Sequence, residues 1–170
     1  MIVTSKFGDL IDQIDCDAIV NSANSSMRAG SGVCGAIHKA AGRDLELNTK
    51  HLAPLIVPNA VITSAFNLPN KYIIHVSTPK FHIDPNPHEL LAKSLYNVFK
   101  LAEEFEVETI ALPAIGTGIH GFPIDAAIAI YAEVASSFNQ SIILKEIRFV
   151  FMSYADEIAM SRRIQTRIEI

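Results

Sequence analysis

Two glycine-rich segments of this 170-residue chain have residue types and a spacing that favour the binding of phosphate groups. Each spells Gly-x-Gly-x-x-Gly, with glycines at positions 30, 32 and 35 in the first segment and 116, 118 and 121 in the second. Glycine lets a backbone approach a ligand closely, and the free N–H groups at the start of a helix bind phosphate oxygens without basic side chains. Two such loops at one edge of a sheet would suit a diphosphate.

The glycine motif alone does not define a dinucleotide-binding domain. A Rossmann loop follows its strand immediately and needs an acidic residue about twenty positions further on. Here the predicted strand ends at Asn21, the first glycine is Gly30, and no carboxylate occurs around residues 55–57. A Walker A loop is excluded because no Gly-Lys-[Ser/Thr] is present. The alternative that both segments are tight turns without a ligand stays open, although the repeated motif weakens it.

Short β-rich runs alternate with longer helical runs, which is typical of an α/β layered fold with a mixed or mostly parallel sheet. We expect strands over residues 2–7, 17–21, 60–63, 71–76, 108–112 and 146–152. We expect helices over residues 35–47, after Pro87, over 124–138 and from Tyr154 onward. The apolar stripe of the helix after Pro87 consists of Leu91, Leu95, Val98, Ala102 and Phe105. Both glycine loops then lie at the carboxyl ends of strands, where open α/β sheets bind ligands.

The composition indicates one globular domain over residues 1–170 and excludes several other classes of protein. Hydrophobic residues make up 49% of the chain, charged residues make up 19%, and the formal net charge is -4. An acidic chain without a Lys/Arg cluster favours neither nucleic acid nor an anionic membrane as a partner. The two cysteines, Cys16 and Cys34, form no Cys-x-x-Cys pair, so we expect no disulfide framework, no metal and no cofactor. We see no signal peptide and no apolar run of membrane-spanning length, and we expect a cytoplasmic monomer.

Four blocks of the sequence resemble the macro domain family, in the family's order and over nearly the whole chain. The first two are DAIVNSAN at 17–24 and GSGVCGAIHKAAG at 30–42. The other two are NLPNKYIIH at 67–75 and PAIGTGIHGFP at 113–123. The resemblance implies a three-layer α/β fold, with a mixed six-stranded sheet between helices, and a cleft for ADP-ribose or an ADP-ribosylated substrate.

The resemblance also implies how individual residues bind the ligand. Asp9, beside Leu10, would accept a hydrogen bond from the adenine amino group, with a turn or capping role as the alternative. Asn24 would bind the distal ribose, whereas Asn21 would hold the loop in place. The residues that would wrap the diphosphate, mainly through backbone amides, are Gly32, Val33, Cys34, Gly116, Thr117, Gly118, Ile119 and His120.

Two aromatic residues complete the implied ligand site. Phe122 would pack near the distal ribose. Tyr154, just past the last predicted strand, would stack on adenine, with an ordinary core or surface position as the alternative.

The chain departs from the family's pattern at Cys34, where members that hydrolyse ADP-ribosyl esters usually carry Asp. His38 is retained four residues later, so the two side chains would share one face of a helix. One interpretation is a thiolate–imidazolium pair at a helix N-terminus, and the other is a small apolar cysteine beside a packed histidine. His120 stands at an aromatic position of the family and would be a general acid, a polar lid or an exposed loop residue.

Two functions of different classes are therefore compatible with the sequence. The first is a hydrolase of ADP-ribosyl esters, on proteins or on O-acetyl-ADP-ribose, with Asn24, Cys34, His38 and His120 as candidate catalytic residues. In it a water held by Asn24, backbone amides and the ligand's phosphate would attack. The second is a module that binds mono-ADP-ribose without turnover. Cys34 favours the binding module, while a single domain with no partner domain to recruit favours the enzyme.

Overall fold

The computed structural model describes residues 1–168, so the last two residues of the predicted domain, 169 and 170, lie outside the described residues. The six predicted strands form one sheet. The strands are β1 (Ile2–Phe7), β2 (Ala18–Ser22), β3 (Ala60–Ser64), β4 (Tyr72–Val76), β5 (Thr109–Leu112) and β6 (Glu146–Phe151). The α-helices are α1 (Gly32–Ala41), α2 (Arg43–Thr49), α3 (Pro87–Glu104), α4 (Ile124–Ser137) and α5 (Tyr154–Ile168). Two short 3-10 helices are η1 (Leu10–Asp12) and η2 (Lys50–Leu52).

The sheet is mixed, as the sequence predicted, because one of its six strands runs against the others. The strand order is β1-β6-β5-β2-β4-β3, and only β3 is antiparallel to its neighbour. The central strands are buried on both faces, which explains their nearly continuous apolar sequences. Five parallel strands, β1, β6, β5, β2 and β4, therefore bring their carboxyl ends to one edge.

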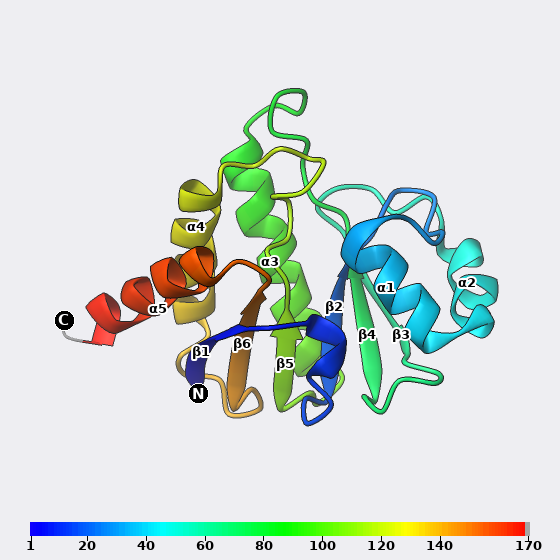
Figure 1. The fold of residues 1–170 in the computed structure, drawn as a ribbon, viewed down its shortest axis with the longest axis horizontal. Helices are drawn as coiled ribbons and strands as arrows, with labels where there is room; N and C mark the ends of the chain where they lie inside the picture. The colour runs from blue at the N-terminus through cyan, green and yellow to red at the C-terminus, as the bar shows by residue number, and fades with distance from the viewer. Residues whose placement is uncertain (169–170) are drawn as a thin grey trace.

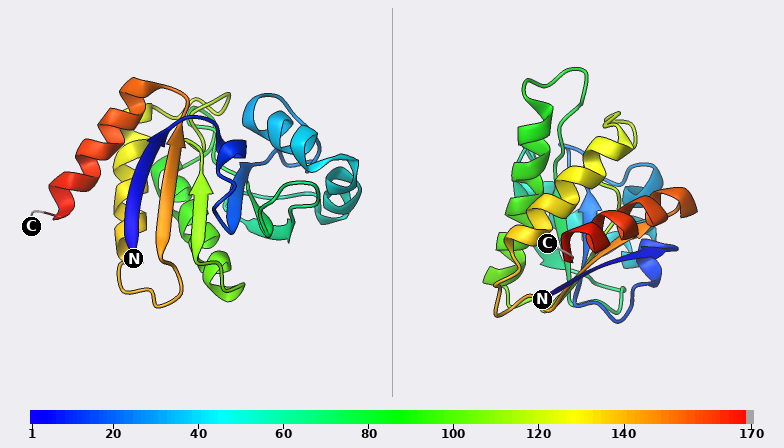
Figure 2. Two further views of the ribbon diagram at one scale, coloured as in Figure 1. Left: turned by 60° about the horizontal axis from the view of Figure 1, so that its bottom comes forward. Right: turned by 90° about the vertical axis from the view of Figure 1, so that its left-hand side faces the viewer.

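Helices cover both faces of the sheet and give the predicted three layers (Figures 1 and 2). On β2, Ala18 and Val20 face the core formed with α3, α4 and part of α5, while Ile19 faces the core formed with α1 and α2. The alternation follows from the period of two along a strand. No helix in the described part of the chain is long and apolar enough to cross a membrane.

The helix predicted over residues 35–47 is two helices, separated at Gly42. Gly42 has a φ of 91°, and a Cβ atom at this position would lie 2.6 Å from the side-chain nitrogen of Asn67. The positive φ favours glycine at this position, and α1 ends here. The helix also begins earlier than predicted, at Gly32.

The inclusion of Phe105 in the apolar stripe of α3 was wrong. The other four stripe residues are buried, but α3 ends at Glu104 and the Phe105 side chain is 43% exposed. Beyond the last turn of a helix, the 3.6-residue period no longer determines which way a side chain points.

The loop between β5 and α4 is tied to the core by Tyr131 of α4. Its hydroxyl donates a hydrogen bond to the carbonyl oxygen of Ile115, and its ring stacks on Phe149 of β6 at a centroid distance of 5.3 Å. Tyr131 is fully buried, and burial raises the pKa of its hydroxyl well above the ordinary value, so the group remains a donor.

We expect Tyr131→Phe to lower the free energy of unfolding by about 1–3 kcal/mol, because the Ile115 carbonyl then loses its buried donor. Urea unfolding followed by circular dichroism measures this loss. Tyr96→Phe is the matched control, because Tyr96 is 48% exposed and its hydroxyl makes no hydrogen bond within the described residues. Equal stability of both variants would contradict the role of Tyr131.

Candidate functional site

A cavity of about 830 Å³ opens at the carboxyl edge of the sheet. Four connections line it: β1 to η1, β2 to α1, β5 to α4, and β6 to α5. Among the described residues that line the cavity, none is Lys or Arg. An anion bound here would therefore be held by neutral hydrogen-bond donors.

The β2–α1 loop supplies the first set of donors. Ser31 caps α1 without a side-chain hydrogen bond, and the amides of residues 30–34 make no hydrogen bond within the described part of the chain. The first amides of a helix lack partners inside the helix and carry its positive dipole end. Gly35 keeps the loop close to the helix, because a Cβ atom here would collide with the carbonyl oxygen of Gly30.

The β5–α4 loop supplies the second set of donors. Gly116, with a φ of 85°, accepts a hydrogen bond of 2.9 Å from the Phe122 amide and closes the loop. The amides of Gly118, Ile119 and His120 make no hydrogen bond within residues 1–168. A Cβ atom on Gly118 would meet nothing within 4 Å, so the backbone here is open to a ligand. The two loops thus present two rows of free N–H groups to one cavity.

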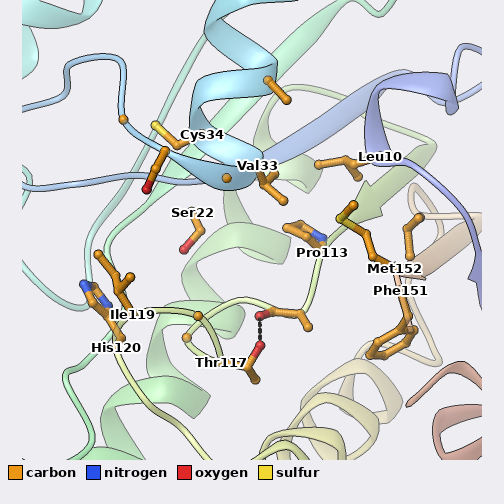
Figure 3. Close-up of a pocket in the computed structure, with 18 of the residues that line it drawn as sticks. Leu10, Ser22, Val33, Cys34, Pro113, Thr117, Ile119, His120, Phe151 and Met152 are labelled. Carbon is orange, nitrogen blue, oxygen red and sulfur yellow. Dashed lines mark hydrogen bonds between the residues drawn. The ribbon is translucent and has the colours of Figure 1, made fainter. Parts of the chain in front are cut away.

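The two ends of the cavity differ in character (Figure 3). Leu10, Val33 and Met152 gather at one end with Phe151, whereas Ile119 and His120 lie at the other. The first end suits a flat apolar group, and the second suits a polar group.

Asp9, next to Leu10, lies at the apolar end of the cavity. It combines the predicted position at the ligand site with the capping role given as the alternative. The side chain lines the cavity, and its Oδ1 also accepts a hydrogen bond of 3.2 Å from the Ile11 amide, which caps η1. The second carboxylate oxygen has no protein donor within the described residues.

Asn24 and Cys34 line the polar part of the cavity and share one hydrogen-bond acceptor, the carbonyl oxygen of Arg28. Asn24 Nδ2 donates to it at 2.8 Å, and Cys34 Sγ lies 3.6 Å from it. Asn24 Oδ1 also accepts from the Ser26 hydroxyl at 2.7 Å. Both side chains therefore stabilise the β2–α1 loop.

No thiolate–imidazolium pair forms, because Cys34 bonds to Arg28 instead. His38 is buried and its Nδ1 has no partner within the described residues. Burial lowers the pKa of His38, which favours the neutral imidazole. This geometry agrees with the packed-histidine interpretation.

His120 is half-buried rather than an exposed loop residue. Its Nδ1 lies 3.0 Å from the Thr78 hydroxyl. Burial, and then the nearby charge of Lys80, lower the pKa of His120, so the ring is neutral near pH 7. A neutral ring can exchange one proton with a ligand at its other nitrogen.

The structure brings eleven of the fourteen predicted site residues to the cavity and leaves three outside its lining. His38 lies on the buried face of α1. Phe122 is buried with its ring 5.0 Å from that of Phe81, and Tyr154 is 64% exposed with its ring edge against Phe7. These three residues do not line the cavity.

Several lining residues were not predicted, and one group lies at the end of β6. Phe151 is the last residue of β6, Met152, Ser153 and Asp156 follow it, and Ser22 is the last residue of β2. The rule that ligands bind at the carboxyl ends of parallel strands could have indicated them.

Asn21 bonds to the neighbouring strand rather than to its loop, contrary to the prediction. Its Nδ2 lies 3.1 Å from His75 Nδ1, and His75 Nε2 lies 2.9 Å from the Thr63 hydroxyl. Because that hydroxyl donates to the Ser64 carbonyl, we infer that His75 carries its proton on Nε2 and accepts from Asn21. Burial lowers the pKa of His75 to about 3.

Comparison with known proteins shows the family of this chain. A profile of the Macro domain matches residues 20–131. The chain is 42% identical over 154 residues to a macro domain-containing protein of Caldanaerobacter subterraneus, which covers 88% of this chain and 87% of that protein. It is 39% identical over 152 residues to an O-acetyl-ADP-ribose deacetylase of Escherichia fergusonii, covering 86% and 85% of the two chains. Among solved structures, a glycine-to-valine mutant of the Oceanobacillus iheyensis macrodomain with ADPR has a TM-score of 0.92 and 32% identity, covering 98% of this chain and 93% of that chain. The chain belongs to the macro domain family.

We expect Gly35→Ala to destabilise the protein by about 1–3 kcal/mol, although alanine is normally favoured over glycine inside a helix. The reason is the collision with the Gly30 carbonyl, which cannot move without opening the loop. Gly118→Ala is the control and should stay within about 0.5 kcal/mol of wild type. Thermal unfolding of both variants measures the difference, and an unchanged Gly35→Ala protein would contradict the packing described.

We expect the contribution of His75 to the free energy of unfolding to decrease as the pH is lowered from about 6.5 to about 3. The reason is that His75 takes up a proton near pH 6.5 in the unfolded chain and only near pH 3 in the folded chain. Unfolding in urea at several pH values measures the slope. In His75→Gln the slope in this window should be smaller by up to about 1.4 kcal/mol per pH unit. Parallel curves for the two proteins would contradict a neutral, buried His75.

Proposed function

We propose that the cavity binds ADP-ribose, with the diphosphate held between the two rows of free backbone amides. The observation that carries this proposal is the convergence of those amides on a cavity whose described lining has no Lys or Arg. Neutral amides at a helix start hold phosphate oxygens in an acidic protein. The relatives support the choice of ligand, because one is named an O-acetyl-ADP-ribose deacetylase and a structural neighbour contains ADPR.

The two ends of the cavity give the bound ligand its direction. Adenine occupies the apolar end beside Leu10 and Met152, where the unbonded oxygen of Asp9 accepts from the 6-amino group. The distal ribose then lies at the other end, near Asn24, Cys34 and His120.

We further propose that the protein hydrolyses esters of the distal ribose. Water adds to the ester carbonyl carbon, the acyl–oxygen bond breaks, and the products are a carboxylic acid and ADP-ribose with its hydroxyl restored. The second Nδ2 hydrogen of Asn24 positions the water, and the free nitrogen of neutral His120 accepts its proton and returns it to the ribose oxygen as the acyl–oxygen bond breaks. The loop amides stabilise the developing negative charge.

The second candidate function is a binding module without turnover, and Cys34 is the observation that favours it. At the position where hydrolytic family members usually carry Asp, this chain has a thiol that lies against the Arg28 carbonyl. A thiol in this contact supplies no carboxylate to activate water. A single measurement of turnover therefore distinguishes a hydrolase from a module that only binds ADP-ribose.

We expect the protein to convert an excess of O-acetyl-ADP-ribose to ADP-ribose and acetate over multiple turnovers. Mass spectrometry of the products, against a no-enzyme control, measures this conversion. Asn24→Ala should reduce kcat by at least about tenfold. Ser26→Ala is the matched control, because it removes a hydrogen bond to Asn24 but leaves the Asn24 side chain in place. Binding of ADP-ribose without any turnover by wild type would support the binding module instead.

We expect Cys34→Asp to raise kcat by about tenfold, because it restores a carboxylate beside the distal end of the cavity. Cys34→Ser controls for loss of the thiol without a gain of charge. If both variants lose activity while still binding ADP-ribose, the thiol itself takes part in turnover, which would contradict the expected role of the carboxylate.

A further inference from the structure

A buried polar relay connects Arg148, in the middle of β6, to the backbone of Asp9 at the apolar end of the cavity. Arg148 Nη1 donates to Gln13 Oε1 at 3.0 Å, and Gln13 Nε2 donates to the Asp9 carbonyl oxygen at 2.8 Å. Gln13 is only 2% exposed. The relay thus ends on a residue that lines the cavity, without itself entering it.

The orientation of Arg148 is fixed because all five of its N–H groups have acceptors. Besides Gln13, Asp15 accepts two hydrogen bonds of 2.9 Å, and Glu146 accepts two of 2.9 and 3.1 Å. The Arg148 side chain is 12% exposed. A guanidinium held by two carboxylates offers its remaining hydrogen in one direction only, toward Gln13.

The chemistry of the two ends dictates which way the Gln13 amide is turned. Arg148 can only donate, so it must face the oxygen of the amide, and a backbone carbonyl can only accept, so Asp9 must face the nitrogen. The backbone of Gln13 is held as well, because Asn70 Nδ2 donates to its carbonyl oxygen at 2.9 Å. Only a side chain with an acceptor and a donor can join these two groups.

The relay bears on the Asp9 carboxylate because it fixes the backbone that carries it. The Asp9 carbonyl oxygen has one other donor, the Asp12 amide at the longer distance of 3.3 Å. Its carboxylate is held at Oδ1 by the Ile11 amide, and the other oxygen of this cavity-lining residue has no donor within the described residues. Without Gln13, Asp9 would keep its bond from the Ile11 amide and lose the shorter of the two hydrogen bonds to its carbonyl oxygen.

We propose that Gln13, anchored by Arg148, is a positioning residue that sets the Asp9 carboxylate for recognition of a 6-aminopurine, and so gives this site its preference for adenine over hypoxanthine. The inference rests on the proposed binding of ADP-ribose. Adenine offers an amino group to the carboxylate, whereas hypoxanthine has an oxygen there that the carboxylate repels. The diphosphate and the distal ribose are the same in both ligands, so only the contact at the base differs.

Calorimetric titration with ADP-ribose and with inosine diphosphate ribose tests this proposal in the full chain. Wild type should prefer ADP-ribose, and Gln13→Met should reduce the ratio of the two affinities by roughly three- to tenfold. The affinity for inosine diphosphate ribose should stay within about twofold of wild type, since the amide loops are untouched. Gln13→Glu is a second variant that still accepts from Arg148 but cannot donate to Asp9, and it should reduce the ratio likewise.

Asp12→Asn is the control, because Asp12 is the exposed neighbour of Gln13 on η1, does not line the cavity, and its side chain makes no hydrogen bond within the described residues. Its ratio of affinities should equal that of wild type. An unchanged ratio in both Gln13 variants, or an equal loss of affinity for both ligands, would overturn the positioning role. Failure of wild type to bind either ligand would instead refute the proposed function, and this inference with it.

Discussion

The proposed binding site depends on keeping two rows of backbone N–H groups unsatisfied beside a cavity that has no positive side chain in its described lining. An unpaired amide is unfavourable in the interior of a protein, so such groups persist only where solvent or a ligand can reach them. Here the start of α1 and the β5–α4 loop place them at the carboxyl edge of the sheet. Because an amide carries no net charge, its contribution depends on direction, and the geometry of both loops must be fixed in advance.

The loops obtain that geometry from contacts behind the cavity. Gly35 packs directly against the carbonyl of Gly30, and Tyr131 holds the carbonyl of Ile115 from within the core. Asn24 and Cys34, which line the cavity, both bond to the carbonyl oxygen of Arg28 and restrain the first loop. Each of these contacts is made to a backbone carbonyl group and not to an N–H group, so the N–H groups of the same loops stay free for a ligand.

The sequence predicted most of the site because its signals are local. A glycine spacing and a strand end specify a loop and the sheet edge where it lies, and both glycine loops do line the cavity. The spacing of Cys34 and His38 predicted a shared helix face, but a shared face does not fix a contact, and the thiol found a nearer acceptor in Arg28. The role of Gln13 depends on Arg148, 135 residues further along the chain, so it could not be inferred from neighbouring residues alone.

The central claim, that backbone amides of the two loops hold a diphosphate, is tested most directly by an amide-resolved NMR titration with ADP-ribose. We expect saturation at one equivalent, with downfield shifts of the amide protons of Val33, Cys34, Gly118 and Ile119, because these N–H groups would gain charge-assisted hydrogen bonds. Amides on the far edge of the sheet, such as those of β3, should not move. Saturable binding that leaves the amides of both loops unshifted would contradict the claim.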